Sequence, residues 1–308
     1  MLDRRAFLLT GLLAAPALVG RAWAAETAYP LWPSTPPGAG GPSGAPEISA
    51  RGAITNVARP FITALRPGKA NGAAMLIAAG GGYKRIENAK EAMPAARWLV
   101  AQGITAFILT YRLPREGWSE PPVAPLQDAQ RALRLIRAMA PSQDIDPDRL
   151  GALGFSAGGH LMGMLATRAA APLYPQADPA DALPARPAVL ALAYPIITME
   201  PPYDDTSARR SLIGRHPSAR QSREWSVETH VRATCPATFL AQAADDPIAD
   251  PAHSAIMADA CRKAGVPVER HLFSAGGHGF AMGRPGTPTT QWPEMLADWL
   301  ARQGFSRG

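Results

Sequence analysis

The sequence predicts an α/β fold with a mainly parallel β-sheet, helices on both faces of the sheet, and a small cap or none. Short apolar runs of strand composition alternate with segments whose apolar residues recur at helical spacing. The 308-residue chain is 47% hydrophobic, which is enough for a large core. Its 32 prolines and 28 glycines separate these apolar runs, which is typical of ordered loops rather than of disorder.

In the first half of the fold, three strands and three helices are predicted. The runs that follow Gly72 and Gly103 are apolar and bounded by glycine, and the third run ends at Phe155. The helices have apolar residues at helical spacing, with Pro94 in the first turn of one and Pro141 beyond the end of another. The strands cover residues 73–79, 105–111 and 149–155, and the helices cover residues 89–102, 125–139 and 157–168.

The second half continues the alternation with three strands and two helices. Asp250 is predicted to cap the helix that starts at Pro251, because aspartate is a favoured cap and proline is tolerated in the first turn. The strands cover residues 189–194, 237–243 and 266–273, and the helices cover residues 251–264 and 292–302. The segments 171–187 and 200–230 lack periodicity, and both are candidates for a small lid or rim over the C-terminal edge of the sheet.

The first 24 residues have the features of a twin-arginine signal peptide. Arg4 and Arg5 precede an apolar stretch that ends in the small-x-small cleavage site Ala22-Trp23-Ala24. The stretch is shorter than the about 20 residues of a membrane-spanning helix, although a retained N-terminal anchor is an alternative. We therefore expect the twin-arginine export machinery to act on residues 1–24, residues 25–308 to form one domain, and the mature bacterial protein to be periplasmic or secreted.

Composition and residue spacing argue against several classes of partner. The net charge is +6, but no run of Lys or Arg is interleaved with aromatic residues, so nucleic-acid binding is not expected. No His, Cys or carboxylate cluster has metal-ligand spacing, and we expect neither a metal nor a cofactor. An oxidising compartment permits a disulfide between Cys235, which precedes a strand, and Cys261, which lies in the next helix; the sequence does not decide whether they meet, and two free or buried thiols are the favoured alternative.

The segment Gly154-Phe155-Ser156-Ala157-Gly158 matches the turn that presents a nucleophilic serine between a strand and a helix. Serine needs a sharp, strained turn there, and side chains at the two glycines would collide with the neighbouring strand and helix. The alternative, an inactive Gly/Ser-rich turn, does not explain the partners described next. Ser156 is therefore the candidate nucleophile.

A serine hydroxyl needs a base, and in hydrolases with this turn the chain order is serine, acid, histidine. Among six histidines, His278 is the candidate because it lies on the glycine-rich loop after the last predicted strand. His160 is better explained by packing or by capping its turn. The others lie before the acid, in the helix that follows it, or in mid-strand: His216, His230, His253 and His271.

Two adjacent aspartates compete for the role of the acid. Asp245 and Asp246 both follow the strand 237–243, from which a carboxylate can accept a hydrogen bond from the histidine and hold its tautomer. Asp250 is explained as a helix cap. The residues alone leave the choice between Asp245 and Asp246 open.

The glycines that follow strand 73–79 are candidates for an oxyanion hole. Gly80-Gly81-Gly82-Tyr83 lets the backbone approach a substrate carbonyl closely. We assign the donors to the N–H groups of Gly81, Gly82 and Ala157. A phosphate-binding loop would need a lysine followed by serine or threonine, or dinucleotide spacing, and the segment has neither.

Taken together, these motifs resemble the acetyl xylan esterase-like group of bacterial α/β-hydrolases over roughly residues 29–304. The resemblance implies an α/β-hydrolase fold, acetyl-ester hydrolysis on plant polysaccharides, and Asp246 as the acid, three residues before the small Ala249. Two positions depart from the group: Ala79 replaces a usual proline, and Gln242 replaces a common histidine. The matching stretches are Pro30 to Pro33, Ile54 to Val57, Gly80 to Tyr83 with Lys90-Glu91, Tyr111 to Leu113, Asp128 to Ala132, Gly154 to His160, Tyr194 to Met199, Asp245-Asp246, Ser254, and Gly276 to Phe280.

We therefore expect a serine esterase that acts on short acyl groups, above all acetyl, of xylan or a related carbohydrate. A peptidase or lipase on the same scaffold is an alternative, although the segments 171–187 and 200–230 are too polar for an apolar lipase lid. A non-catalytic carbohydrate-binding relative would be expected to lack one of the three catalytic residues. Four aromatics in or near loops are candidates for a sugar platform: Tyr83 and Trp118 first, then Tyr203 and Trp225.

Overall fold

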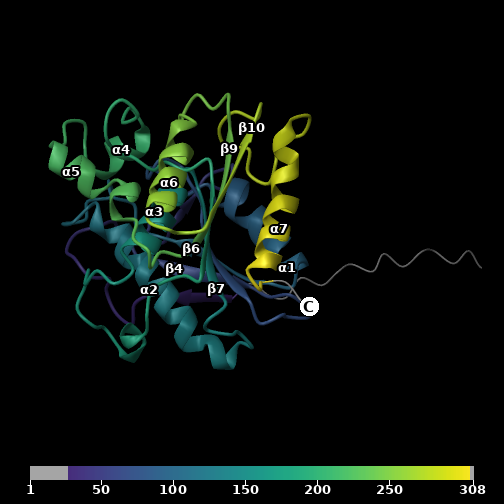
Figure 1. The fold of residues 1–308 in the computed structure, drawn as a ribbon. Coiled ribbons are helices and arrows are strands. Elements are labelled where there is room, and N and C mark those ends of the chain that lie inside the picture. Colours follow the sequence, from purple (N-terminus) through teal and green to yellow (C-terminus); the bar gives the residue numbers. More distant parts are fainter. Residues whose placement is uncertain (1–26, 306–308) are drawn as a thin grey trace, which may run out of the picture.

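The computed structural model describes residues 27–305, and the predicted signal peptide lies outside them. Eight strands form one sheet in the order β1-β4-β6-β5-β7-β8-β9-β10 (Figure 1). The strands from β6 to β10 in this order are parallel, whereas β4 and β1 are antiparallel to their neighbours. The bounds are β1 Thr27–Pro30, β4 Phe61–Leu65, β5 Ala74–Ala78, β6 Thr105–Thr110, β7 Leu150–Phe155, β8 Val189–Ala193, β9 Ala237–Ala243 and β10 Val268–Phe273.

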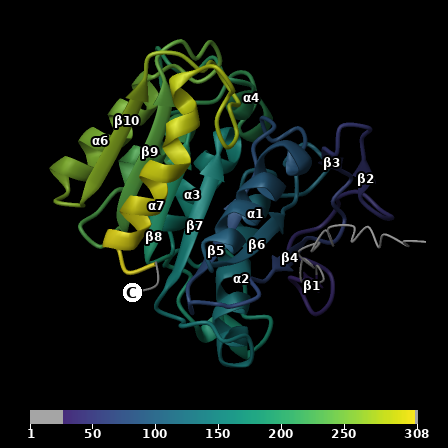
Figure 2. The same ribbon diagram turned by 90° about the vertical axis from the view of Figure 1, so that its right-hand side faces the viewer.

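Helices cover both faces of this sheet, as the strand–helix alternation predicts. In Figures 1 and 2, α1 and α7 lie on one face, and α2, α3 and α6 lie on the other. The bounds are α1 Met93–Ala101, α2 Val123–Met139, α3 Ser156–Thr167, α6 Ala252–Lys263 and α7 Trp292–Arg302. The strands β5 to β8 are buried along their whole length, so the core lies between the sheet and its two helical layers.

The predicted elements agree with the structure to within two residues, except at the start of the first helix. There a π-helical turn, Asn88–Ala92, precedes α1. Helix α6 begins at Ala252, one residue later than expected, and Asp250 Oδ1 still accepts a hydrogen bond from the Ala252 N–H (2.8 Å). The short elements β2 Glu47–Ile48 and β3 Ile54–Thr55 form a separate pair, and 3-10 turns cover Ala140–Ser142, Pro179–Ala182, Val227–His230 and Pro288–Gln291.

The expectation that segment 171–187 forms a lid is wrong. Its side chains and carbonyls bind helix α2: the buried Arg131 pairs with Asp178 and with Asp181 (3.1 Å), and Arg134 donates to the Leu183 carbonyl (3.1 Å). None of its residues lines the cavity that contains Ser156. The two aspartates and the Leu183 carbonyl thus tie the segment to two arginines of α2.

Segment 200–230 does lie beside the cavity that contains Ser156. It contains two short helices, α4 Ser207–Leu212 and α5 Ala219–Glu224, which lie close together in Figure 1. Thr206 caps α4 by accepting from the Arg209 N–H (3.1 Å), and Ser218 forms a capping box with Gln221. Within residues 27–305, no helix is both long and apolar enough to cross a membrane.

Candidate active site

The turn between β7 and α3 holds Ser156 in a strained backbone conformation. Its φ of 51° lies in the left-handed region, which non-glycine residues rarely adopt. A Cβ at Gly154 would come within 2.4 Å of the Gly158 carbonyl oxygen, and one at Gly158 within 2.2 Å of the Ala78 carbonyl oxygen. Only glycine therefore allows strand, turn and helix to approach this closely, as the sequence predicts.

The structure brings Ser156, His278 and Asp246 together at the C-terminal edge of the sheet. Ser156 Oγ lies 2.9 Å from His278 Nε2. On the other side of the ring, His278 Nδ1 lies 2.8 Å from Asp246 Oδ2 and 3.1 Å from Oδ1. Ser156 is the first residue of α3, directly after β7, and the loops after β9 and β10 supply Asp246 and His278, because the ends of parallel strands meet at one edge of the sheet.

Asp246 is positioned by a full set of hydrogen-bond donors. The N–H groups of Ile248 and Ala249 both donate to its Oδ1 (2.9 Å each), and Gln242 Nε2 donates to its Oδ2 (3.0 Å). Asp245 is exposed and instead accepts the Gly277 N–H (2.7 Å), so it supports the histidine loop without touching the ring. The geometry favours Asp246 as the partner of His278.

Gln242 is a positioning residue to which the sequence assigns no role. It is fully buried, and its amide nitrogen also contacts the Ala249 carbonyl (3.2 Å). Among the described residues its Oε1 has no hydrogen-bond partner. The departure from the common histidine was the only signal at this position, and it did not indicate a contact with the acid.

The loop after β5 places the predicted oxyanion donors beside Ser156. Gly81 and Gly82 have φ values of 117° and 65° and line the same cavity as Ser156 and His278. Among the described residues, the N–H groups of Gly81 and Gly82 donate no hydrogen bond. Ala157 is the second residue of α3, where helix geometry leaves the N–H without an intrahelical acceptor. All three N–H groups are thus available to a ligand.

A buried carboxyl group fixes the position of this loop. Glu91 Oε2 accepts the Gly80 N–H (2.6 Å), and Glu91 Oε1 accepts the Tyr194 hydroxyl (3.1 Å). Tyr194 in turn accepts the Ala281 N–H (3.1 Å), and its ring contacts His278 edge-on at 5.1 Å. Burial raises the pKa of Glu91, which the hydrogen bonds from Gly80 and Tyr194 partly oppose. Glu91 and Tyr194 therefore link the glycine loop to the histidine loop.

Two other histidines are buried and serve the structure. His160 accepts the Tyr83 hydroxyl at Nδ1 (2.8 Å) and donates from Nε2 to the Trp225 carbonyl (2.7 Å). His253 Nδ1 accepts the N–H groups of Ile197 and Thr198. Burial lowers the pKa of both rings to about 4, so both are neutral near pH 7.

The cavity around Ser156 and His278 has a volume of about 210 Å³, and its far wall includes Thr206, Ser207 and Ala208 of the α4 region. The expectation that Tyr83 contacts substrate is wrong: it is only 1% exposed, and it does not line this cavity. Its hydroxyl serves His160 instead. Trp118 lies on the wall of an adjoining cavity, with the Arg112 guanidinium over its ring at 4.9 Å.

Neither a metal centre nor a disulfide accompanies the site in the described part of the chain. Residues 27–305 contain no group of three or more His, Cys, Asp or Glu side chains able to hold a metal ion. Cys235 and Cys261 are unpaired, as expected from their predicted elements.

Comparisons with known proteins identify the family. The BD-FAE family model matches residues 65–261. An acetylxylan esterase from Xylanibacter ruminicola is 28% identical over 238 residues, which are 76% of this chain and 46% of that protein. Endo-1,4-beta-xylanase B from Butyrivibrio fibrisolvens is 31% identical over 208 residues, which are 68% of this chain and 32% of that protein. The chain thus spans less than half the length of these two relatives.

The fold is also found in solved structures. An acetyl ester-xyloside bifunctional hydrolase from Caldicellulosiruptor lactoaceticus matches with a TM-score of 0.76 and 30% identity, over 91% of this chain and 97% of that one. A carboxylesterase from Lactobacillus plantarum matches with a TM-score of 0.68 at 24% identity, over 86% of this chain and 100% of that one, and supports the fold alone. From the family match and these likenesses, the chain belongs to the BD-FAE family and is an α/β-hydrolase of the acetyl xylan esterase-like group.

Proposed function

We propose that this protein is a serine carboxylic-ester hydrolase that removes acetyl and other short acyl groups from plant polysaccharides or their fragments. The observation that carries the proposal is the continuous hydrogen-bonded chain from Ser156 Oγ through His278 to Asp246, which opens into a cavity next to Gly81 and Gly82. A serine, a base and an orienting acid in this arrangement form the minimal apparatus for acyl transfer.

The first half-reaction forms an acyl-enzyme. Ser156 Oγ attacks the ester carbonyl carbon while His278 Nε2 takes the hydroxyl proton, and the carbonyl π electrons move onto oxygen. The N–H groups of Gly81, Gly82 and Ala157 stabilise this oxyanion. The tetrahedral intermediate then collapses, the bond to the sugar oxygen breaks, and His278 gives its proton to the departing alcohol.

The second half-reaction returns the free enzyme. Water attacks the acyl carbon, His278 accepts one of its protons, and the proton passes to Ser156 Oγ as the bond between serine and acyl group breaks. Asp246 accepts the hydrogen bond from His278 Nδ1 and stabilises the imidazolium that forms in each step. The products are a carboxylic acid and regenerated serine, with no cofactor consumed.

Size and likeness support a small acyl group on a carbohydrate. The cavity at Ser156 has a volume of about 210 Å³, is walled by Ile196, Ala208 and Ile248, among other residues, and is large enough for a short acyl group. Two of the similar proteins are named for acetyl esters, one as an acetylxylan esterase and one as an acetyl ester-xyloside hydrolase. Both features favour acetate on a sugar over a lipid or peptide substrate.

Replacing the nucleophile tests the proposal. Ser156→Ala should abolish hydrolysis of 4-nitrophenyl acetate while leaving the circular dichroism spectrum and thermal unfolding of the wild type. Turnover by the folded variant would refute the assignment of Ser156. In the wild type, kcat/KM should be highest for acetate across 4-nitrophenyl esters of increasing chain length; a maximum at long chains would indicate a lipase. Acetate release from acetylated xylan, pectin and small sugar acetates then identifies the carbohydrate.

We also propose that the protein acts outside the cytoplasm after twin-arginine export. Arg4 and Arg5 support this route, together with the cleavage site that ends at Ala24. Replacing both arginines by lysine should leave the esterase in the cytoplasmic fraction, whereas the unaltered chain should be recovered in the periplasm or medium. Equal export of both forms would argue for another route.

A further inference from the structure

A second, larger cavity adjoins the one that contains Ser156. Its volume is about 710 Å³, within the range of small-molecule binding sites. Lys84 lines both cavities, and the α4 region contributes Ser207 to the smaller one and Arg210 to the larger one. A ligand whose acyl group lies at Ser156 can therefore extend into the larger cavity.

The walls of this larger cavity are basic. They include Lys84, Arg115, Arg210 and Arg215, and they include neither aspartate nor glutamate. Arg210 pairs with the exposed Asp205. Within residues 27–305, the other three side chains form no ion pair, whereas the buried Arg112 is fully paired with Asp128. Unpaired cations around a concave wall concentrate positive potential and attract an anionic ligand.

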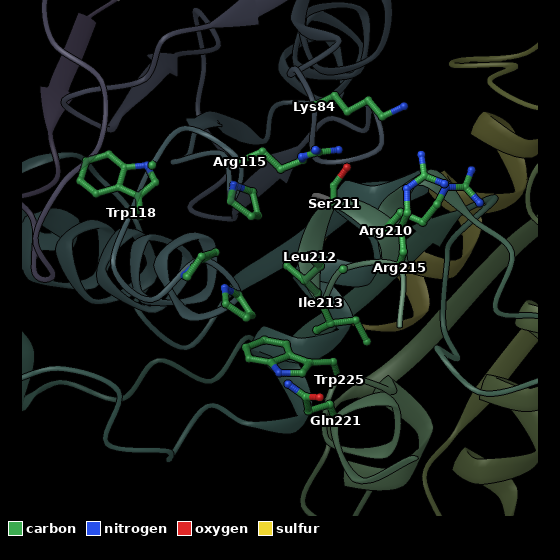
Figure 3. Close-up of a pocket in the computed structure, with 15 residues that line it drawn as sticks. Lys84, Arg115, Trp118, Arg210, Ser211, Leu212, Ile213, Arg215, Gln221 and Trp225 are labelled. Carbon is green, nitrogen blue, oxygen red and sulfur yellow. The ribbon is translucent and has the colours of Figure 1, made fainter. Parts of the chain in front are cut away.

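An apolar surface faces these charges. Figure 3 shows Lys84 and Arg115 toward one side of the cavity and Trp225 toward the other, with Leu212 and Ile213 between them. Trp225 is held in place by the Arg168 guanidinium at 5.4 Å from its ring centre and by His160, which donates to the Trp225 carbonyl. Trp225 and Leu212 are only 6% and 3% exposed and Ile213 is half-buried, so a narrow apolar strip is open to the C–H edge of a sugar ring, which a small inorganic anion lacks.

We propose that this larger cavity binds a carboxylated sugar, a uronic acid unit, of the same acetylated chain whose acetyl group is removed at Ser156. This inference rests on the proposed esterase function. Arginine binds carboxylate in a planar, two-point geometry, and the flexible Lys84 lies where the two cavities meet. Charge and apolar surface side by side therefore select an acidic oligosaccharide over a neutral one.

The test compares matched substrates. Acetylated oligosaccharides from glucuronoxylan and from pectin are each used as prepared and after reduction of the carboxyl groups to alcohols, and acetate release gives kcat and KM. The wild type should prefer the carboxylated form of at least one pair by about tenfold in kcat/KM, mainly through KM, since one charge-assisted contact is worth that order of magnitude. The preference should shrink as salt is added.

Two variants locate the effect. Arg115→Gln combined with Arg215→Gln should reduce the preference to about one, with each value expressed relative to the same variant's turnover of 4-nitrophenyl acetate. Arg262→Gln combined with Lys263→Gln removes the same number of charges at the end of α6, outside both cavities, and should retain the preference. Calorimetric binding of the carboxylated substrate to Ser156→Ala should weaken with the double substitution.

The outcomes separate the two proposals. If 4-nitrophenyl acetate and sugar acetates are hydrolysed but both members of each substrate pair react equally, the carboxylated-sugar proposal is wrong and the esterase stands. If Ser156→Ala retains activity, the esterase mechanism itself fails. Inhibition by sodium sulfate as strong as by a free uronic acid at equal ionic strength would indicate a general anion site and would also overturn the proposal.

Discussion

Glu91 provides the sharpest test of how the backbone donors are held in place, because its hydrogen bonds go to Gly80 and Tyr194 rather than to Ser156 or His278. Its carboxyl group accepts the Gly80 N–H at 2.6 Å and the Tyr194 hydroxyl at 3.1 Å, and it is only 3% exposed. Glu91→Ala leaves both donors without this acceptor. Glu91→Gln is the matched control, because its amide oxygen can still accept from Gly80 while its amide nitrogen faces the Tyr194 oxygen.

The expected loss of stability follows from these two contacts. A buried donor left unsatisfied costs about 1–3 kcal/mol. Removal of a carboxyl group whose pKa burial raises offsets part of that cost. We therefore expect Glu91→Ala to lower the free energy of unfolding by about 2–4 kcal/mol, and Glu91→Gln by less, both measured by urea unfolding.

The kcat of Glu91→Ala should fall by more than the loss of folded protein explains. Loss of one oxyanion donor lowers kcat by about 10²–10³-fold in enzymes of this type. Without Glu91 the glycine loop loses its anchor at Gly80, so we expect kcat for 4-nitrophenyl acetate to fall about 100-fold with little change in KM. Glu91→Gln should stay within about tenfold of the wild type. Wild-type kcat in a folded Glu91→Ala variant, or equal losses in both variants, would refute the positioning role.

The pH dependence of stability adds a second check. Because burial raises the pKa of Glu91 above its ordinary value of 4.5, the folded state binds this proton more tightly than the unfolded state does. The resulting stability is full below the unfolded pKa and is lost as the pH rises through the folded one. Glu91→Gln should remove that part of the slope, which urea titrations at several pH values can detect.

Three further predictions concern the acid, its support and the buried histidines. Asp246→Asn should lower kcat by about 10⁴-fold, as in other triads, whereas Asp245→Asn, which still accepts from the glycine loop, should stay within tenfold; steady-state kinetics decides. Gln242→Glu should lower kcat more than Gln242→Leu, because it places a second carboxylate against the first, and equal kcat values would contradict this. The pKa of about 4 for His160 and His253, against 6.5 when unfolded, means that stability is full above pH 6.5 and is lost as the pH falls toward 4. Each ring should lower the free energy of unfolding by about 2 kcal/mol at pH 5 relative to pH 8. An unfolding free energy that does not change between pH 8 and pH 5 would contradict this.

Most of the parallel sheet is predictable because its strands are apolar on both faces and bounded by glycine or proline. Strand β4 was not predicted. Phe61–Leu65 lies between Pro60 and Arg66-Pro67, and five residues give too short a pattern to separate from a loop. Its strand conformation depends on pairing with β6 on one side and β1 on the other. The antiparallel end of the sheet is therefore set by tertiary contacts.

Local motifs also predict the residues of the candidate site, but they do not predict the residues that hold those side chains and loops in position. The turn around Ser156 and the loop around His278 can be recognised because each needs glycines within a few residues. The link from Glu91 to Tyr194 spans 103 residues, and the link from Tyr194 to Ala281 spans 87. No local pattern predicts that these groups meet. The prediction that Tyr83 contacts substrate was wrong for the same reason, because its hydrogen-bond partner His160 lies 77 residues away in the sequence.

The basic cavity shows how topology can turn a dispersed charge into a local one. Along the chain its four cations are spread from Lys84 to Arg215, and this spacing indicates only a mildly basic surface. They follow β5, β6 and β8, three parallel strands whose C-terminal ends meet at the edge of the sheet where Ser156 also lies. The strand ends that position Ser156 therefore also bring these four cations close together. Substitutions at single loop residues would then change the charge of this cavity without altering the sheet or the contacts among Ser156, His278 and Asp246.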